Sequence, residues 1–319
     1  MELKYAPIII PTLNRYEHLK RCITTLQRNP WAKYTPLYIS VDYPPAAKYE
    51  EGYYRICEYL KRGIEGFASV SVYYQDHNLG AYDNQEFLLA EIRKKFDRYI
   101  FTEDDNEFSP NFLEFMDKGL MLFEQDEQVI YICAAGTAGP ETELDNVVLS
   151  TNFAAYGYGT WFAKNDIIQK KICRKYFTEI AHNNRKMLEL AKVDPSLLFA
   201  LQSAIFRKER LYQMPNGEIP LIDMTKKIYM VLEKKYAVAC LWRKARNWGY
   251  DGSGENCTDG NREFLKNIQV NIDTREHFEY AYSRPMRIFP IRAKYSLEIF
   301  CRVCMVFIKI GIWRITGEK

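Results

Sequence analysis

The sequence lacks a long uncharged apolar run and a dense run of one charge, and each absence excludes a class of protein. No stretch of about 18 to 20 uncharged apolar residues occurs, which argues against a membrane-spanning helix. The net charge is only +3, and no sustained run of Lys and Arg with interleaved aromatic residues is present, so nucleic acid is not an expected partner. The segment after Met1 has no basic region followed by an apolar stretch and a cleavage site, so no secretory signal is expected.

Histidine is scarce and cysteine is scattered. The four histidines lie far apart and form no His/Cys metal pattern. Of the eight cysteines, only Cys301 and Cys304 form a close pair, and their apolar surroundings are typical of packing. Scattered cysteines without a secretory signal indicate reduced thiols and predict a cytoplasmic protein. The chain does have 47% hydrophobic residues over 319 positions, enough for the core of one large domain or two smaller ones.

Apolar periodicity predicts an alternation of strands and helices in the first half of the chain. The expected strands cover 8–10, 37–41, 70–74, 99–102 and 129–134. The expected helices cover 16–28, 48–62, 82–95 and 111–124. This order predicts an α/β domain with a largely parallel central sheet. Because ligands of such sheets bind at the carboxyl ends of the strands, polar groups at those ends form the candidate site.

Three carboxylates, Glu103, Asp104 and Asp105, follow directly after the fourth expected strand. Asp42 and the segment 12–15 stand at two other expected strand ends. Neighbouring carboxylates repel each other, and a hard divalent cation such as Mg²⁺ or Mn²⁺ removes that cost while it holds substrate phosphates. The alternative is a solvated acidic turn that caps the next helix. The strand-end position, shared with Asp42, favours a metal that holds a diphosphate.

Five segments carry a resemblance to a known family. They are "IIIPTLNRYEHLKRCITTL" (8–26), "PLYISVDY" (36–43), "IFTEDDNEFSPNFLEFM" (100–116), "YGYGTWF" (156–162) and "RNWGYDGSGENC" (246–257). The third resembles the metal-binding segment of nucleotide-sugar-dependent glycosyltransferases of the GT-A fold. The first two resemble the initial strands of one such family, that of the N-acetylglucosaminyltransferase that initiates complex N-glycans. The fourth resembles its acceptor side, and the last resembles bacterial polysaccharide and lipopolysaccharide sugar transferases.

The resemblance implies a division of the chain. A GT-A glycosyltransferase domain, with a Rossmann-like, mostly parallel sheet flanked by helices, would cover 1–283. Its nucleotide-binding half would be 1–135 and its acceptor-side half 136–283. Residues 284–319 would then form a C-terminal helical tail.

The resemblance also implies roles at the donor site. Asp105 would be the direct ligand of a Mn²⁺ or Mg²⁺ cofactor. Asp104 would contact the ribose or a metal-bound water, and Glu103 the donor sugar. Arg15 would lie beside the nucleotide, and Asp42 would accept a hydrogen bond from the base. The alternatives are a surface residue at a helix start for Arg15 and a turn former for Asp42.

The acceptor side needs a base in an inverting transfer, because the acceptor hydroxyl loses its proton as it attacks. Asp223, at the start of an expected helix, is the candidate, and Glu218 is the fallback. The alternative role of Asp223 is a helix cap. Tyr158 and Trp161, expected just before a strand and a helix, would line the sugar or acceptor pocket, unless they pack in the core.

A turn-rich segment in the second half is a candidate lid. Its residues Gly249, Asp251, Gly252, Ser253 and Gly254 could order over bound donor and exclude water. The alternative is an ordinary surface loop.

The tail 284–319 holds eight basic and two acidic residues, so it carries +6. A polar stripe along an expected helix is formed by Lys294, Glu298, Arg302, Lys309 and Thr316. Most other positions from 297 to 315 are apolar. Such a helix either lies in a membrane interface or packs on the body of the protein, and the basic charge favours the membrane.

Together these features predict an inverting, metal-dependent glycosyltransferase. It would move a sugar from a nucleotide-sugar, by preference a UDP-sugar, to a hydroxyl of a glycan or lipid-linked acceptor in surface polysaccharide biosynthesis. The tail predicts a peripheral position on the inner face of the cytoplasmic membrane. One alternative is a sugar-phosphate nucleotidyltransferase, against which the lack of a Gly-rich, basic phosphate loop after the first strand argues. The other is a non-catalytic, membrane-associated carbohydrate-binding protein, against which the acidic triplet and Asp223 argue.

Overall fold

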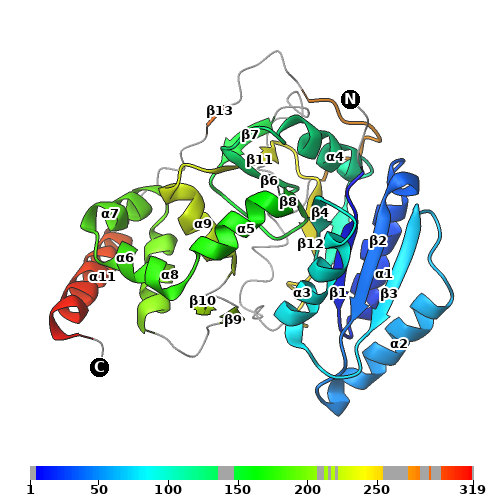
Figure 1. Ribbon diagram of the computed structural model, residues 1–319, viewed down its shortest axis with the longest axis horizontal. Coiled ribbons are helices and arrows are strands. Elements are labelled where there is room, and N and C mark those ends of the chain that lie inside the picture. The colour runs from blue at the N-terminus through cyan, green and yellow to red at the C-terminus, as the bar shows by residue number, and fades with distance from the viewer. Residues whose placement is uncertain are drawn as a thin grey trace. The chain divides into compact units, whose positions relative to one another are not determined.

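Most strands of the described residues join one nine-stranded sheet, in the order β13-β7-β11-β6-β8-β4-β1-β2-β3 (Figure 1). The structure, a computed structural model, describes residues 5–135, 147–206, 212–214, 217–219, 222–253, 272–280, 287–288 and 296–317. The chain divides into two compact units. The larger comprises Met1–Leu149, Ala154–Phe162 and Val238–Arg287, and the smaller comprises Ser150–Phe153, Ala163–Ala237 and Ile288–Lys319.

The parallel part of the sheet follows the sequence prediction. Its strands are β1 (Ile8–Thr12), β2 (Pro36–Val41), β3 (Ser69–Tyr74) and β4 (Arg98–Phe101). β8 (Tyr158–Trp161) lies between β4 and β6 (Val129–Cys133) and runs antiparallel to both. The remaining strands are β7 (Val147–Ser150), β11 (Tyr236–Cys240) and β13 (Arg287–Ile288). The largely parallel α/β sheet is therefore confirmed, with an antiparallel strand inside it.

Four helices alternate with these strands, as predicted. They are α1 (Tyr16–Gln27), α2 (Glu50–Lys61), α3 (Gly80–Arg93) and α4 (Phe112–Leu122), and short 3₁₀ helices occur at η1 (Ala32–Tyr34) and η2 (Ala47–Tyr49). The expected bounds of the first five strands and four helices differ from these by one or two residues. The expectation that Tyr158 and Trp161 precede a strand is wrong, because these residues form β8 itself.

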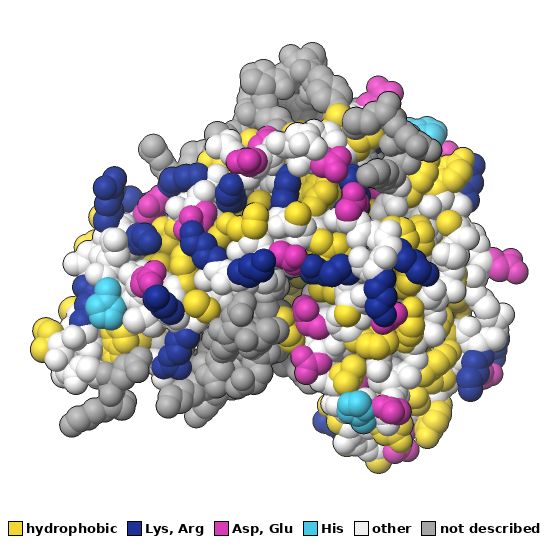
Figure 2. All heavy atoms as spheres, viewed as in Figure 1, with side chains coloured by type: hydrophobic (Ala, Val, Ile, Leu, Met, Phe, Trp, Pro, Cys, Tyr) yellow, Lys and Arg dark blue, Asp and Glu magenta, His cyan; other side chains and the backbone are white. Residues whose placement is uncertain are grey.

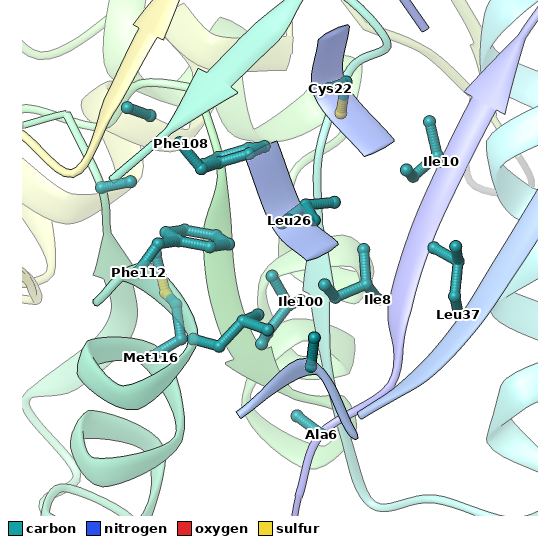
Figure 3. Close-up of a cluster of buried hydrophobic side chains, with 14 of the residues drawn as sticks. Ala6, Ile8, Ile10, Cys22, Leu26, Leu37, Ile100, Phe108, Phe112 and Met116 are labelled. Carbon is teal, nitrogen blue, oxygen red and sulfur yellow. The ribbon is translucent and has the colours of Figure 1, made fainter. Parts of the chain in front are cut away.

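The main core forms where α1 and α4 pack on the centre of the sheet (Figure 3). Ile8, Ile9 and Ile10 of β1 are completely buried, as expected for a parallel strand covered on both faces. Leu26 of α1 and Phe112 of α4 are buried in the same cluster. This packing fixes the strand ends that carry the polar residues described below.

The smaller unit is mostly helical. It contains α5 (Phe162–Lys171), α6 (Arg174–Ala181), α7 (Asn184–Val193), α8 (Pro195–Phe206), the hairpin of β9 (Tyr212–Met214) and β10 (Gly217–Ile219), α9 (Ile222–Leu232) and α11 (Leu297–Thr316). Of the described helices, none is long and apolar enough to cross a membrane.

The predicted tail helix is present as α11. It begins after Ser296, whose hydroxyl accepts a hydrogen bond from the Ile299 backbone N–H at 3.2 Å. Four members of the predicted polar stripe are exposed: Glu298, Arg302, Lys309 and Thr316. Lys294, the fifth, lies outside the described residues. On the face seen in Figure 2, basic, acidic and apolar side chains of the described residues are interspersed.

Asp117 of α4 is a buried carboxyl in the core of the larger unit. Its Oδ1 accepts a hydrogen bond from the Ala6 backbone N–H at 2.9 Å, and its Oδ2 has no hydrogen-bond partner among the described residues. Burial raises the pKa of Asp117 to about 8, although the Ala6 hydrogen bond and the charge of Arg98 both oppose that rise. The folded protein therefore holds this carboxyl in its neutral form at neutral pH.

We expect the contribution of Asp117 to the stability of the protein to fall as the pH rises from about 4, where an unfolded Asp titrates, towards about 8, the folded pKa of Asp117. In this window the folded state keeps a proton that the unfolded chain has lost. Asp117→Asn is neutral at every pH, so it should remove a dependence of roughly 1 kcal/mol per pH unit. Urea denaturation of both proteins at a series of pH values measures this. Stability curves that stay parallel would contradict the assignment.

Candidate active site

Two neighbouring parallel strands bring the acidic triplet and the segment 12–15 together. β1 and β4 pair in register, with Ile8 opposite Ile100 and Ile9 opposite Phe101, so both end at the same edge of the sheet. The Thr12 hydroxyl at the end of β1 donates a hydrogen bond to Asp104 Oδ2 at 2.7 Å. The predicted meeting of polar groups at strand ends is thus observed for these two strands.

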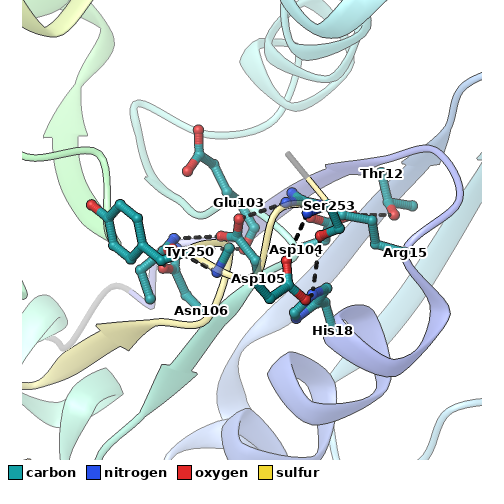
Figure 4. Close-up of polar contacts among 12 residues, drawn as sticks. Thr12, Arg15, His18, Glu103, Asp104, Asp105, Asn106, Tyr250 and Ser253 are labelled. Atoms are coloured by element: carbon teal, nitrogen blue, oxygen red, sulfur yellow. Dashed lines mark hydrogen bonds and ion pairs between the residues drawn. The ribbon is translucent and has the colours of Figure 1, made fainter. Parts of the chain in front are cut away.

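Arg15 bridges the two aspartates of the triplet (Figure 4). Its Nη1 donates to Asp105 Oδ2 at 2.7 Å, and its Nη2 contacts Asp104 Oδ1. Both carboxylates are buried, with 3% of Asp104 and 6% of Asp105 exposed. Glu103 is half-buried, and its carboxyl points away from this pair. The guanidinium therefore supplies the positive charge that two adjacent buried carboxylates need.

The positive charge of Arg15 compensates the negative charges of Asp104 and Asp105 only in part. Burial raises the pKa of Asp105, Asp104 raises it further, and Arg15 opposes both. Burial disfavours the charged guanidinium of Arg15, but Asp104 and Asp105 outweigh that effect and raise its pKa. When all three groups are ionised, two negative charges face one positive charge, so one negative charge is left uncompensated among them.

A two-stranded ribbon holds a distant segment against Asp105. β12 (Ala245–Asn247) pairs antiparallel with β5 (Asn106–Phe108), which directly follows the acidic triplet. Asn247 Nδ2 donates to Asp105 Oδ1 at 2.6 Å, and the Trp248 backbone N–H donates to the Asp105 carbonyl at 2.8 Å. The Gly249 N–H donates to Asn247 Oδ1 at 2.8 Å and so orients that amide.

Charge pairs of Glu107 fix the ribbon. Arg246 donates to both oxygens of Glu107 at 2.8 Å, and Trp248 Nε1 donates to Glu107 Oε2 at 2.6 Å. Burial opposes the ionised form of Glu107, but these hydrogen bonds hold its pKa below the usual range. The Arg21 guanidinium of α1 lies 4.7 Å from the centre of the Trp248 ring, which ties the ribbon to α1.

The candidate lid residues contact α1 through His18. Asp251 Oδ2 lies 2.9 Å from His18 Nε2, and Ser253 Oγ lies 3.4 Å from the same atom. Burial opposes ionisation of Asp251, but hydrogen bonds from Ser253 and His18 lower its pKa to about 2. Gly254 lies outside the described residues. Gly249 lies against Asp105, and the closure of the segment over a ligand stays a prediction.

The carboxylate of Asp42 is hydrogen-bonded to other groups of the protein. It is 3% exposed and caps α3. Its carboxylate accepts hydrogen bonds from the N–H groups of Tyr43 at 2.9 Å, Leu79 at 2.8 Å and Gly80 at 2.9 Å, and from Asn78 Nδ2 at 3.0 Å. These four bonds weigh against the predicted contact with a nucleotide base, which stays untested.

Four further predicted residues were assigned to the acceptor side. Tyr158 is 1% exposed and Trp161 is 4% exposed, and Tyr158 packs against Phe101 and Tyr131 in the core. The core-packing alternative describes both rings, and an acceptor role stays a prediction. Asp223 is half-buried in the first turn of α9, in the smaller unit. Glu218 lies in β10, where only the backbone is described.

The sequence interpretation missed His18 and Asn247. His18 was available as a polar residue one turn after Arg15 on a helix that starts at the site. Asn247 was available as the amide residue that ends a short strand before the Gly-rich turn. The sequence does not show which residue either of them contacts. Asn247 and Asp105, for example, are 142 positions apart in the chain.

The acidic pair is chemically suited to a divalent metal. Within the described ranges, no cluster of three or more His, Cys, Asp or Glu side chains could hold a metal ion. Mg²⁺ commonly uses only one or two protein carboxylates and completes its shell with waters and substrate phosphates, and Mn²⁺ also takes oxygen ligands. Asp104 and Asp105, buried and adjacent, fit a metal that binds together with a diphosphate.

Gly249 must be glycine for Asp105 to keep its place. A Cβ at this position would lie 2.2 Å from Asp105 Oδ2 and 3.0 Å from Asn247 Oδ1. We expect Gly249→Ala to displace the Asp105 side chain and lower the free energy of unfolding by about 1 to 3 kcal/mol. Gly311→Ala is the matched control, since nothing lies within 4 Å of its Cβ. Gly311→Ala should lose no stability, and a Gly249→Ala variant as stable as the parent protein in urea denaturation would argue against this packing.

Comparison with known proteins places the chain. The model of the GNT-I family matches residues 2–167. Two solved structures share local similarity: S. aureus TarS, with 14% identity over 46% of this chain and 25% of that one and a TM-score of 0.31, and S. aureus TarS 1–349 in complex with UDP, with 13% identity over 45% of this chain and 40% of that one and a TM-score of 0.32. The matches thus span less than half the length of either TarS chain, and no curated protein matches. Since the family match covers more than half of its residues, the chain belongs to the GNT-I family.

Proposed function

We propose that this protein is a metal-dependent, inverting glycosyltransferase, and that it moves a sugar from a UDP-sugar to a hydroxyl of a glycan or lipid-linked acceptor. The observation that carries the donor half of the proposal is the buried pair of Asp104 and Asp105 at the end of β4, held by Arg15. The preference for UDP is the one that the sequence resemblance implies.

The residues toward the donor have distinct parts in this proposal. Asp105 is the metal ligand, with Mn²⁺ or Mg²⁺ as the cation, and Asp104 lies beside it toward the ribose or a metal-bound water. Bound there, the metal would neutralise charge on the leaving nucleoside diphosphate. Arg15, which holds both carboxylates, would turn its guanidinium to the phosphates when they bind. Glu103, whose carboxyl points away from the pair, would face the donor sugar.

The acceptor side uses Asp223 as the general base. An inverting transfer needs a carboxylate that takes the proton of the attacking hydroxyl. Asp223 is half-buried in the first turn of α9, and the positive end of a helix favours an ionised carboxylate. Glu218 is the fallback base. The segment from Gly249 to Gly254 would exclude water from the donor once it is bound.

The same proposal assigns a function to each part of the chain. Residues 1–135 form the nucleotide-binding half, 136–283 the acceptor-side half, and 284–319 a tail that brings the enzyme to its acceptor. A cytoplasmic enzyme at the inner face of the membrane would meet the lipid-linked glycans from which surface polysaccharide or lipopolysaccharide is made. The +6 charge of the tail supports this location.

The donor site is tested by thermal unfolding with UDP-, GDP-, CMP- and dTDP-sugars, each with and without Mn²⁺. A ligand that binds only the folded protein stabilises it by about 2.7 kcal/mol at a concentration of about 100 times its Kd. We expect a rise in Tm with UDP-sugars that requires Mn²⁺ and is lost in Asp105→Asn.

Glu58→Gln is the control, because Glu58 is an exposed carboxylate of α2 that pairs with Arg62, four positions further along the chain. It should keep the full rise in Tm. A well-folded parent protein that responds to no donor, or an Asp105→Asn variant that responds like the parent, would refute the donor site.

A further inference from the structure

The helix α11 has two different apolar faces. Val303, Val306 and Ile310 are buried, and α11 packs on α8 in the smaller unit. The Arg314 side chain also anchors the helix, since its Nε donates to the Ala181 carbonyl of α6 at 2.7 Å. The helix is therefore held on the body by one face, and its other face is left to solvent.

The outward face of α11 carries large apolar side chains along its whole length. All six are at least 50% exposed: Leu297, Phe300, Met305, Ile308, Ile312 and Ile315, of which Ile315 is 86% exposed. At 3.6 residues per turn these positions fall within an arc of roughly 140°, along a helix about 30 Å long. Scattered exposed apolar residues are common, but a continuous apolar face of this size marks an interaction surface.

No charged residue interrupts this arc. The other residues on it are Cys301, Cys304 and Gly311. The exposed polar residues Glu298, Arg302 and Lys309 lie together along one border of the arc. The helix contains one acidic residue and three basic ones, Arg302, Lys309 and Arg314. An apolar face bordered by polar residues with an excess of basic side chains is typical of helices that lie in a membrane interface.

We propose that the outward face of α11 binds the surface of a phospholipid bilayer that contains anionic lipids. The apolar side chains enter the headgroup and acyl boundary, and Arg302 and Lys309 meet the anionic headgroups beside them. The helix lies in the plane of the membrane, because its inner face stays packed on α8.

The width of the arc distinguishes this partner from a second copy of the chain. A helix that pairs with another helix presents a narrow apolar seam, in which positions three and four apart meet the partner. A bilayer surface contacts the whole outward half of a helix. It can therefore cover an apolar arc of roughly 140°, which a narrow seam between two helices would not. The excess of basic residues would also oppose the approach of a second copy, while it favours an anionic surface.

The test uses the full chain and measures co-sedimentation with vesicles of phosphatidylcholine mixed with phosphatidylglycerol, and with vesicles of phosphatidylcholine alone. We expect stronger binding to the anionic vesicles. The double variant Ile308→Gln/Ile312→Gln should lower binding at least about tenfold, because both exposed side chains leave the lipid phase. Lys309→Gln should lower binding about fivefold on the anionic vesicles only.

Leu188→Gln on α7 is the matched control, since Leu188 is a 47% exposed apolar residue on another helix of the same unit. Its vesicle binding should equal that of the parent. No binding to either vesicle, or equal binding by the double variant, would overturn the proposal. A dimer detected by light scattering that the double variant dissociates would overturn it in favour of a second copy. Vesicle binding needs no donor or acceptor, so this result is independent of the proposed transfer reaction.

Discussion

The site depends on one electrostatic arrangement, the guanidinium of Arg15 between the buried carboxylates of Asp104 and Asp105. Two like charges side by side in a poorly solvated place raise each other's energy, so a cation must share the place. The register of β1 and β4 puts the segment after β1 next to the turn after β4, which lets Arg15 reach both carboxylates. The fold thus creates a place that needs positive charge whether or not a ligand is bound.

The groups around Asp105 determine which further ligands a bound metal ion would need. Arg15, Asn247 and the backbone N–H of Trp248 all direct donors at Asp105. In the part of the chain that the structure describes, no third acid joins the pair to complete a metal site. A metal bound here would therefore take most of its remaining ligands from water and substrate phosphates, which couples metal binding to donor binding. Gly249 permits this crowding because it has no Cβ to meet Asp105.

Local patterns in the sequence predicted the alternating strands and helices of the first half. Buried positions are apolar, so the run from Ile8 to Ile10 and the spacing of apolar residues in α1 are visible in the sequence itself. They also predicted the acidic strand end and its neighbour Arg15. They could not predict the antiparallel insertion of β8, or the pairing of β12 with β5, because both depend on contacts between distant segments. The cap that Asp42 forms on α3 was missed for a related reason, since its donors at Leu79 and Gly80 lie more than 35 positions away.

The most direct test of this account is a calorimetric titration of Mn²⁺, without nucleotide, into the parent protein and Arg15→Gln. If the Arg15 guanidinium occupies the position that a metal cation would take, the Arg15→Gln variant has two uncompensated carboxylates. The affinity of this variant for Mn²⁺ should then be at least about tenfold higher than that of the parent. Arg55→Gln is the control, because Arg55 pairs with Glu17 on the exposed surface, and it should bind Mn²⁺ like the parent. A folded Arg15→Gln variant that binds Mn²⁺ no better than the parent would contradict the claim that Asp104 and Asp105 form a cation site.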